Sequence, residues 1–318
     1  MIEREVTILS GDIKLRGICC LPDDKGPFPV ILYISGSGPI DRNENIPGLR
    51  LNNSKIIAHH LAQKRIASLR YDKRGVGDSE GDFYSASHND LVDDAVASIQ
   101  FLQQQTYIET GKVYVAGHSE GSIIATQVAN RQQDIAGIIL VAPFCDNMET
   151  ILVKQAQHLK SKVMGQKELK ALAGKLMTFL FDPIKAQKKL INKIKESNKP
   201  FIRFLAYSGL KKVPANWFRE LFVLDVEQIY RQCDVPALLI GGSKDIQCDP
   251  YDVMKIKNIY GGIAEAHIVE KMSHLLRKEE EDPSVFNYHA QLKQTIMPEV
   301  LELIDAWLQR ELQDKNPR

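Results

Sequence analysis

The pentapeptide Gly-His-Ser-Glu-Gly at residues 117–121 constrains the fold of this chain more than any other stretch. It follows the apolar, β-branched run at 113–116, which predicts a buried strand, and it opens a stretch with helical spacing at 119–131. A turn from a strand directly into a helix strains the backbone of its middle residue, and flanking glycines remove the side chains that would collide there. The sequence therefore predicts that Ser119 lies at the carboxyl end of a strand, beside the amide groups of a helix N-terminus.

Runs that predict strands alternate with stretches that predict helices along most of the 318 residues. Residues 4–9 and 13–20 flank a Ser-Gly-Asp turn signal and predict an antiparallel hairpin. The remaining alternation predicts an α/β fold, in which a mostly parallel sheet has helices on both faces. The predicted strands are 30–34, 66–71, 113–116, 138–142, 237–240 and 266–269, and the predicted helices are 50–64, 87–104, 119–131, 251–258 and 297–313.

The alternation stops between residues 145 and 231, where the pattern predicts helix throughout and no buried strand. Basic residues outnumber acidic ones in this stretch, whereas acidic residues are in excess in the rest of the chain. We therefore expect a core in two parts, residues 1–144 and 232–318, with a helical cap inserted at 145–231. Lysines scattered on such helices usually form a solvated face, and the aromatic interleaving of a nucleic-acid site is absent.

The composition is that of an ordinary globular protein, with 44% hydrophobic and 25% charged residues and a formal net charge of +1. This net charge gives no sign of a nucleic-acid partner. No apolar run approaches the ~20 residues that span a bilayer, so no membrane insertion is expected. The residues from Met1 onward open into a strand pattern and do not predict a signal peptide.

The number and spacing of the cysteines indicate the redox state of the protein's compartment and whether a metal site is to be expected. There are five, two of them adjacent at 19 and 20, and none forms a Cys-x-x-Cys pair. This usage favours reduced thiols and a cytoplasmic location, and it disfavours a zinc site. No cofactor or other metal is expected, and the sequence leaves the oligomeric state open.

A serine hydroxyl is a poor nucleophile until a base removes its proton, and that base needs an orienting partner of its own. Of the eight histidines, His274 follows the predicted strand 266–269 by a few residues, which places it in a loop at the same sheet edge as Ser119. The side chain of His118 is expected to point elsewhere in a turn of this kind. His274 is therefore the expected base. The remaining histidines have helical, loop or strand contexts: 59, 60, 88, 158, 267 and 289.

The acid that orients the base is expected at the end of another strand. Asp245 leaves the predicted strand 237–240 through a Gly-Gly turn. Asp249 is the competing candidate, but it stands just before Pro250, and Asp-Pro at a helix start is an ordinary capping signal. We therefore favour Asp245 as the acid.

The oxyanion that forms during attack by Ser119 needs two amide donors. Glu120 follows the serine and offers one N–H. Ser37, in the loop after the predicted strand 30–34, is expected to offer the other.

Two loops contain charged residues and glycines whose role is less specific. The glycines at 36 and 38 do not form a dinucleotide fingerprint, because Asp41 stands at the third glycine position and Pro39 removes an amide. Arg42 either binds a substrate carboxylate or ties its loop to Asp41, and we favour the structural role. Residues 71–81 lack the lysine spacing of a phosphate loop and are predicted to form a structural loop at the rim of the site.

Taken together, these features resemble the α/β-hydrolase superfamily and, within it, the bacterial EstD-type carboxylesterases. The resemblance covers nearly the whole chain, and its most specific part is the loop Ser-Gly-Ser-Gly-Pro-Ile-Asp-Arg-Asn at 35–43. Asn43 and Cys248 depart from the Asp and Val that the family usually has, which leaves the substrate preference open. The resemblance implies Ser119 as nucleophile, Asp245 as acid, His274 as base, and Ser37 and Glu120 as oxyanion donors, in the nucleophile, acid, histidine order of that superfamily.

The implied function is that of a serine hydrolase acting on a small-molecule ester of small to medium acyl chain, through an acyl-enzyme. An aminopeptidase, a thioesterase or an acyltransferase with the same triad is an alternative, although the basic stretch 145–231 offers few carboxylates to hold the amine of a peptide. A non-catalytic binding protein on this fold is a third reading, which the three intact catalytic residue types disfavour. Trp217 and Phe218 are expected either to pack within the cap or to form a wall of the acyl pocket.

Overall fold

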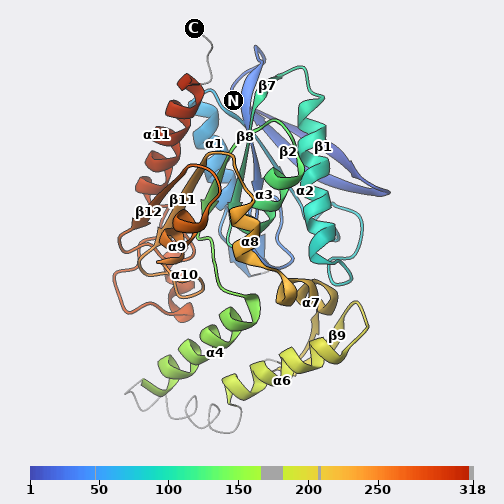
Figure 1. Ribbon diagram of the computed structural model, residues 1–318, viewed down its shortest axis with the longest axis vertical. Helices are drawn as coiled ribbons and strands as arrows, with labels where there is room; N and C mark the ends of the chain where they lie inside the picture. Colours follow the sequence, from blue (N-terminus) through green and yellow to red (C-terminus); the bar gives the residue numbers. More distant parts are fainter. Residues whose placement is uncertain (47, 166–181, 207–208, 315–318) are drawn as a thin grey trace.

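The computed structural model describes residues 1–46, 48–165, 182–206 and 209–314. Its centre is an eight-stranded sheet in the order β1-β2-β6-β3-β7-β8-β11-β12 (Figure 1). The N-terminal hairpin and the six strands predicted from apolar runs are all present. The strands are β1 (Ile2–Ser10), β2 (Ile13–Leu21), β3 (Phe28–Ile34), β6 (Ala67–Tyr71), β7 (Ile108–His118), β8 (Ile135–Val141), β11 (Ala237–Gly242) and β12 (Ala264–Val269).

The pairing of these strands brings several loops to one edge. β1 pairs antiparallel with β2, with Ile2 opposite Leu21, and β2 pairs antiparallel with β6. The other neighbouring pairs in the sheet are parallel. The residues that follow β3, β7, β11 and β12 therefore meet at the same carboxyl edge, which is where ligands bind in sheets of this kind.

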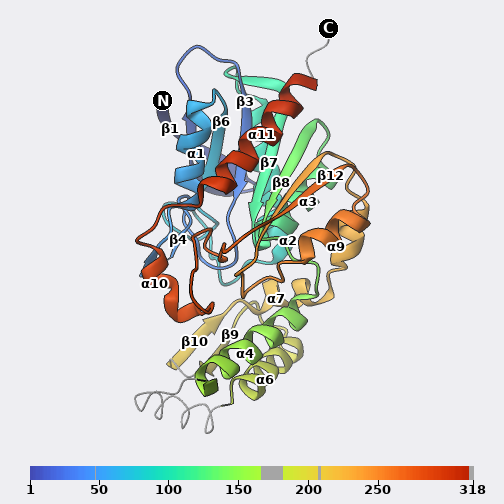
Figure 2. The ribbon, with the colours of Figure 1, turned by 90° about the vertical axis from the view of Figure 1, so that its left-hand side faces the viewer.

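Two layers of helices cover the sheet, and the alternation of side chains along each strand decides which layer a residue meets. Leu32 and Val115 pack in one core with residues of α2 (His88–Gln103), α3 (Glu120–Arg131) and α9 (Asp252–Ile259). Their neighbours Tyr33 and Tyr114 face the other way and pack with α1 (Asn53–Gln63) and α11 (Pro298–Asp314). Figure 2 shows α1 and α11 together over that second face.

The stretch between β8 and β11 contains a hairpin as well as helices, so the prediction of helix throughout is wrong there. Ile202 and Phe204 are buried and alternate with exposed neighbours, which is the period of a strand. Residues 166–181, also predicted to be helical, lie outside the described residues. The elements are α4 (Met148–Gly165), α6 (Pro183–Glu196), β9 (Ile202–Ala206), β10 (Gly209–Val213), α7 (Ala215–Val223) and α8 (Val226–Arg231).

Figure 1 shows α4, α6 and β9 gathered beyond the end of the sheet at which β8 leads to α4. Short elements in other loops complete the described structure: β4 (Asn45–Ile46), β5 (Leu49–Arg50), η1 (Val285–Asn287) and α10 (Tyr288–Gln291). Among the helices in the described ranges, none is both long enough and apolar enough to cross a membrane.

Candidate active site

Ser119 lies between β7 and α3 in a backbone conformation that few non-glycine residues adopt, with φ 55° and ψ −119°. The strain predicted from the sequence is therefore present at this residue. A Cβ on Gly117 would lie 2.0 Å from the carbonyl oxygen of Gly121, and a Cβ on Gly121 would lie 2.2 Å from the carbonyl oxygen of Ile34. Only glycines permit this close approach of α3 to β3, which places Ser119 at the carboxyl edge of the sheet.

Asp245 and His274 come from the ends of the neighbouring strands β11 and β12 and form a buried hydrogen bond. His274 Nδ1 lies 2.7 Å from Asp245 Oδ2, and both side chains are almost fully buried. The other carboxylate oxygen of Asp245 accepts from the amides of Gln247 at 2.8 Å and Cys248 at 3.0 Å. A carboxylate held in this way fixes the ring orientation and the tautomer of the histidine, and it leaves Nε2 available for proton transfer.

Asp249, the competing acid, is engaged elsewhere. Its Oδ1 accepts from the amide of Tyr251 at 3.0 Å, at the start of α9, and its Oδ2 lies 3.7 Å from Lys255 Nζ. Of the two candidate acids, Asp245 is the one that the fold brings to His274.

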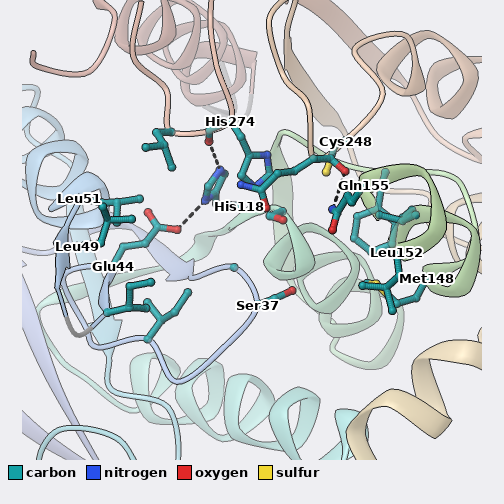
Figure 3. A pocket seen from close by; sticks show the side chains of 18 of the residues that line it. Ser37, Glu44, Leu49, Leu51, His118, Met148, Leu152, Gln155, Cys248 and His274 are labelled. Atoms are coloured by element: carbon teal, nitrogen blue, oxygen red, sulfur yellow. Dashed lines mark hydrogen bonds and ion pairs between the residues drawn. The ribbon is translucent and has the colours of Figure 1, made fainter. Parts of the chain in front are cut away.

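Ser119 and His274 line one cavity of about 370 Å³, shown from close by in Figure 3. Within the described part of the chain, the hydrogen bonds of His274 run to Asp245 and His118, and the bond to Ser119 Oγ is not formed. In hydrolases this last contact is often long until a substrate binds. Most of the cavity wall is apolar, and its apolar side chains include Leu49, Leu51, Phe144, Met148, Ile151, Leu152, Trp217 and Phe218.

Ser37 lines the same cavity, and its loop runs close beside the nucleophile. A Cβ on the preceding Gly36 would lie 3.2 Å from Ser119 Cβ. Lys73 Nζ donates to the Gly36 carbonyl and lies 3.4 Å from a carboxylate oxygen of Glu120. One buried lysine therefore connects the segments that contain the two predicted oxyanion donors.

The side chain of Glu120 is fully buried and accepts a hydrogen bond from Trp217 Nε1. Burial would raise the pKa of Glu120, but Lys73, His88 and Trp217 together hold that pKa below its usual range. Trp217 and Phe218 both line the cavity, and their ring centroids lie 4.4 Å apart. The two roles expected as alternatives for these rings, packing and pocket wall, thus coincide in the structure.

Arg42 does not line the cavity that contains Ser119. Its Nε donates to Asp72 Oδ2 at 3.0 Å, its backbone amide donates to Asp72 Oδ1 at 2.7 Å, and its guanidinium also reaches Asp78. Asp41 instead accepts from the backbone amides of Asn43 and Asn45 at 2.8 Å each. The partner of Arg42 is therefore the loop at 71–81, and the guanidinium joins two loops at the rim.

Glu44 and His118 are residues of the cavity that sequence reasoning missed. The His118 side chain faces the cavity, contrary to expectation: its Nδ1 lies 2.7 Å from Glu44 Oε1, and its Nε2 lies 3.0 Å from the carbonyl oxygen of His274. Burial would lower the pKa of His118, but the Glu44 and Asp245 carboxylates raise it above its ordinary value. Burial would raise the pKa of Glu44, but His118 and Tyr33 keep it below its ordinary value. The one sequence signal was the histidine beside the nucleophile.

Cys248 also lines the cavity, and burial raises the pKa of its thiol well above the ordinary value, as do the nearby carboxylates. One ligand atom each from Asp245, Cys248 and His274 lies within 4.8 Å of the others, a spacing that a metal ion tolerates. Asp245 and His274 already bond each other, which is the arrangement expected of the predicted acid and base, and the Cys248 thiol lies beside them.

The mostly parallel sheet, the strained serine turn and the Asp–His pair at one sheet edge define an α/β-hydrolase. The family model described as serine aminopeptidase, S33, matches residues 51–281, and the chain belongs to this family. The curated esterase EstD of Thermotoga maritima is 26% identical over 250 residues, which are 79% of this chain. The chain spans about half the length of that relative, 53%.

Solved structures share the fold over nearly the whole chain at low sequence identity. Est1E from Butyrivibrio proteoclasticus, solved with ferulic acid, has a TM-score of 0.62 and 18% identity, over 98% of both chains. The α/β-hydrolase GrgF from Penicillium sp. sh18 has a TM-score of 0.63 and 13% identity, over 98% of this chain and 99% of its own. At these identities the likeness concerns the fold, and the chemistry has to be argued from the site.

Proposed function

We propose that this protein is a serine carboxylesterase that cleaves esters of small to medium acyl chain. The observation that best supports this is the buried hydrogen bond between Asp245 and His274, which faces the cavity containing Ser119 on its strained turn. The similarity to the EstD esterase supports the same chemistry.

In the proposed mechanism, His274 Nε2 takes the proton of Ser119 Oγ as that oxygen attacks the ester carbonyl. The negative charge that develops on the carbonyl oxygen is stabilised by the amides of Ser37 and Glu120. Collapse of the intermediate breaks the ester bond, and the departing alcohol takes the proton from the His274 imidazolium. Water, activated by the same histidine, then releases the acid from the acyl-enzyme. Asp245 holds the ring in the correct tautomer throughout.

The cavity wall favours an uncharged ester over a peptide with a free amine. Among the described residues that line it, Glu44 is the one with a carboxylate, and both of its oxygens already accept hydrogen bonds, from Tyr33 and His118. An aminopeptidase needs an unengaged carboxylate to bind the amine of its substrate. We therefore place peptidase activity, despite the family description, below esterase activity.

We also propose that residues 145–231 form a cap that sets substrate size. Met148, Leu152 and Gln155 of α4 and Trp217 and Phe218 of α7 line the cavity opposite the residues from the sheet edge. A cytoplasmic location is proposed from the five free cysteines.

The test is a panel of p-nitrophenyl esters of increasing acyl length, with aminoacyl amides and acyl thioesters alongside. We expect the esters of small to medium chain to be the best substrates by kcat/KM. A fluorophosphonate should label one serine, mapped to Ser119, and Ser119→Ala should lose several orders of magnitude in rate while staying folded. Preference for aminoacyl amides or thioesters would reassign the activity within the same triad, and turnover by a purified Ser119→Ala variant would overturn the mechanism.

A further inference from the structure

Three segments of the active site meet at one buried pair of side chains, Glu44 and His118 (Figure 3). Glu44 lies in the loop after β3, His118 is the last residue of β7, and His274 lies in the loop after β12. Glu44 is 2% exposed and His118 is 3% exposed. Neither side chain has a step in the mechanism proposed above.

Both ring nitrogens of His118 face oxygen atoms that accept hydrogen bonds when Glu44 is ionised. Nε2 lies 3.0 Å from the backbone carbonyl oxygen of His274, which can only accept, and Nδ1 lies 2.7 Å from Glu44 Oε1. A neutral imidazole has one N–H and can donate to one of these acceptors, whereas an imidazolium donates to both. The second oxygen of Glu44 accepts from the Tyr33 hydroxyl at 2.9 Å. A protonated His118 beside an ionised Glu44 satisfies all of these contacts, and the directions of the pKa shifts, raised for His118 and lowered for Glu44, agree with this assignment.

Glu44 has an unfavourable backbone conformation, and hydrogen bonds within its loop hold it there. Glu44 has φ 67°, a left-handed conformation that is costly for a residue with a side chain. Its amide donates to the Asp41 carbonyl at 2.9 Å, and the amide of Asn45 donates to the Asp41 carboxylate at 2.8 Å. The backbone amide of Gly36, the residue before Ser37, also helps to lower the pKa of the Glu44 carboxyl. The Glu44 carboxylate therefore interacts both with the predicted oxyanion loop and with the His118 ring, which in turn contacts the His274 carbonyl.

The charged and titratable groups around His118 favour its protonated form. Glu44 contributes from the β3 loop and Asp245 from the loop after β11. His274 presents its carbonyl oxygen from the loop after β12, and the two imidazole centroids lie 4.9 Å apart. Tyr33 and Arg277 act on Glu44 from its other side, the first through a hydrogen bond and the second through its charge.

We propose that the Glu44–His118 ion pair is a positioning element that holds the His274 backbone and the Gly36–Ser37 loop at a fixed separation. The base and one oxyanion donor then act on the same substrate carbonyl. The pair itself contacts no reacting atom. This inference rests on the proposed function, since it concerns the base of that site.

Glu44→Gln tests the proposal because it keeps the shape of the side chain and removes its charge. His118 then lacks the carboxylate that favours the imidazolium, and a neutral ring cannot donate both to the introduced amide oxygen and to the His274 carbonyl. We expect kcat for every ester of the panel to fall by about 10- to 100-fold, since misplacing a catalytic group by about 1 Å costs on the order of 10² in rate. KM should change little. The control is Glu265→Gln, the same substitution in a partly exposed pair whose carboxylate lies 2.6 Å from His267 Nε2, and it should leave kcat unchanged.

The pH profile separates positioning from a loss of stability. In the wild type, kcat should decline on the alkaline side as His118 loses its proton, whereas His118→Gln should have a low kcat without this alkaline decline. The protonation state of His118 can also be measured in the wild type itself, from its ¹⁵N NMR spectrum. The His118→Gln variant serves only to assign the His118 signals. Both ring nitrogens of His118 should be protonated at neutral pH.

Two results would overturn the proposal: a neutral His118 at pH 7, or a folded Glu44→Gln variant with the kcat and pH profile of the wild type. Either result leaves the proposed function intact provided that Ser119→Ala is inactive. Turnover by Ser119→Ala, in contrast, overturns the esterase mechanism whatever Glu44→Gln does, so the two failures are distinguishable.

Discussion

Trp217 Nε1 in α7 donates a hydrogen bond to the side chain of Glu120, the residue that follows the nucleophile. The indole also lines the cavity. A residue of the proposed cap is thus bonded directly to the first turn of α3, which contains the proposed oxyanion donor Glu120. This contact makes Trp217 the most informative position at which to separate cap packing from substrate selection.

Replacing Trp217 with Phe should destabilise the protein and change its selectivity. In the variant the buried Glu120 carboxylate loses the hydrogen bond from the indole N–H. Its remaining neighbours are Lys73 Nζ at 3.4 Å and His88 Nδ1 at 3.6 Å. We expect the free energy of unfolding to fall by about 1–3 kcal/mol. With the smaller ring in the cavity wall, KM and the chain-length preference for larger esters should shift, whereas turnover of an acetyl ester should change much less. Denaturant unfolding and the ester panel measure the two effects.

Trp307→Phe is the matched control for this substitution. Trp307 lies in α11 on the opposite face of the sheet and packs edge-on against Tyr114, with the ring centroids 5.9 Å apart. This variant also loses part of a buried indole, but it should keep the wild-type ester preference. If a folded Trp217→Phe variant kept that preference as well, the cap would not select the substrate, and the acyl pocket would have to be sought among the core loops.

The acid can be tested by a pair of matched substitutions. Asp245→Asn should leave the fold intact but favour the wrong tautomer of His274, at a cost on the order of 10⁴ in kcat if it behaves as the chymotrypsin aspartate does. Asp249→Asn should cost little, because Asn accepts from the Tyr251 amide about as well as Asp does at a helix start. Steady-state kinetics of the two purified variants, with circular dichroism as the check on folding, give the ranking. The reverse ranking would identify Asp249 as the acid.

Strand ends made much of the site predictable from the sequence. The apolar runs before Ser119, Asp245 and His274 predicted parallel strands, and parallel strands end at one edge whatever the details of their packing. The same reasoning placed Ser37 after β3. The glycines at 117 and 121 predicted the strain now seen in the φ angle of Ser119.

Contacts that depend on loop conformation were not predictable. Glu44 has no periodicity or spacing around it, and its position depends on a left-handed φ that no residue pattern specifies. Arg42 pairs with Asp72, thirty positions further along the chain, because the tertiary fold brings the loop after β3 against the loop at 71–81. The β9–β10 hairpin was missed because its strands are short and contain basic residues, so the burial of Ile202 and Phe204 appears only in the tertiary structure.

The cysteines provide a test that does not depend on the active site. Cys19, Cys20, Cys145, Cys233 and Cys248 are all free thiols, and burial raises the pKa of Cys145, the least buried of them, to about 11. We expect slow reaction with a thiol reagent in the native protein near pH 8, because the thiolate is the reactive form. In denaturant all five should react without prior reduction. A stoichiometry below five would indicate a disulfide and contradict a reducing compartment.

The pH dependence of stability provides a test of the Glu44–His118 pair that is independent of kinetics. The folded pKa of His118 is raised, so its contribution to stability is fully present below its unfolded value, about 6.5, and is lost as pH rises through the folded pKa. The folded pKa of Glu44 is lowered, so its contribution is present above its unfolded value, about 4.3, and is lost as pH falls through the folded pKa. The ion pair should therefore stabilise the fold most between about pH 4.3 and about pH 6.5, where both contributions are fully present.

The measurement is urea unfolding of the wild type and of His118→Gln at a series of pH values. Titrations elsewhere in the chain are common to both proteins and cancel in the difference between their unfolding free energies. That difference should be largest in mildly acidic solution and should shrink as the pH becomes alkaline, because His118 then loses its proton. His267→Gln, which removes a partly exposed histidine paired with Glu265, serves as the control and should show a small difference that varies little with pH. If the difference between wild type and His118→Gln were the same at every pH, folding would leave the pKa of His118 unshifted, and if it shrank as pH fell below about 6.5, His118 would be neutral in the fold. Either result would contradict the ion pair.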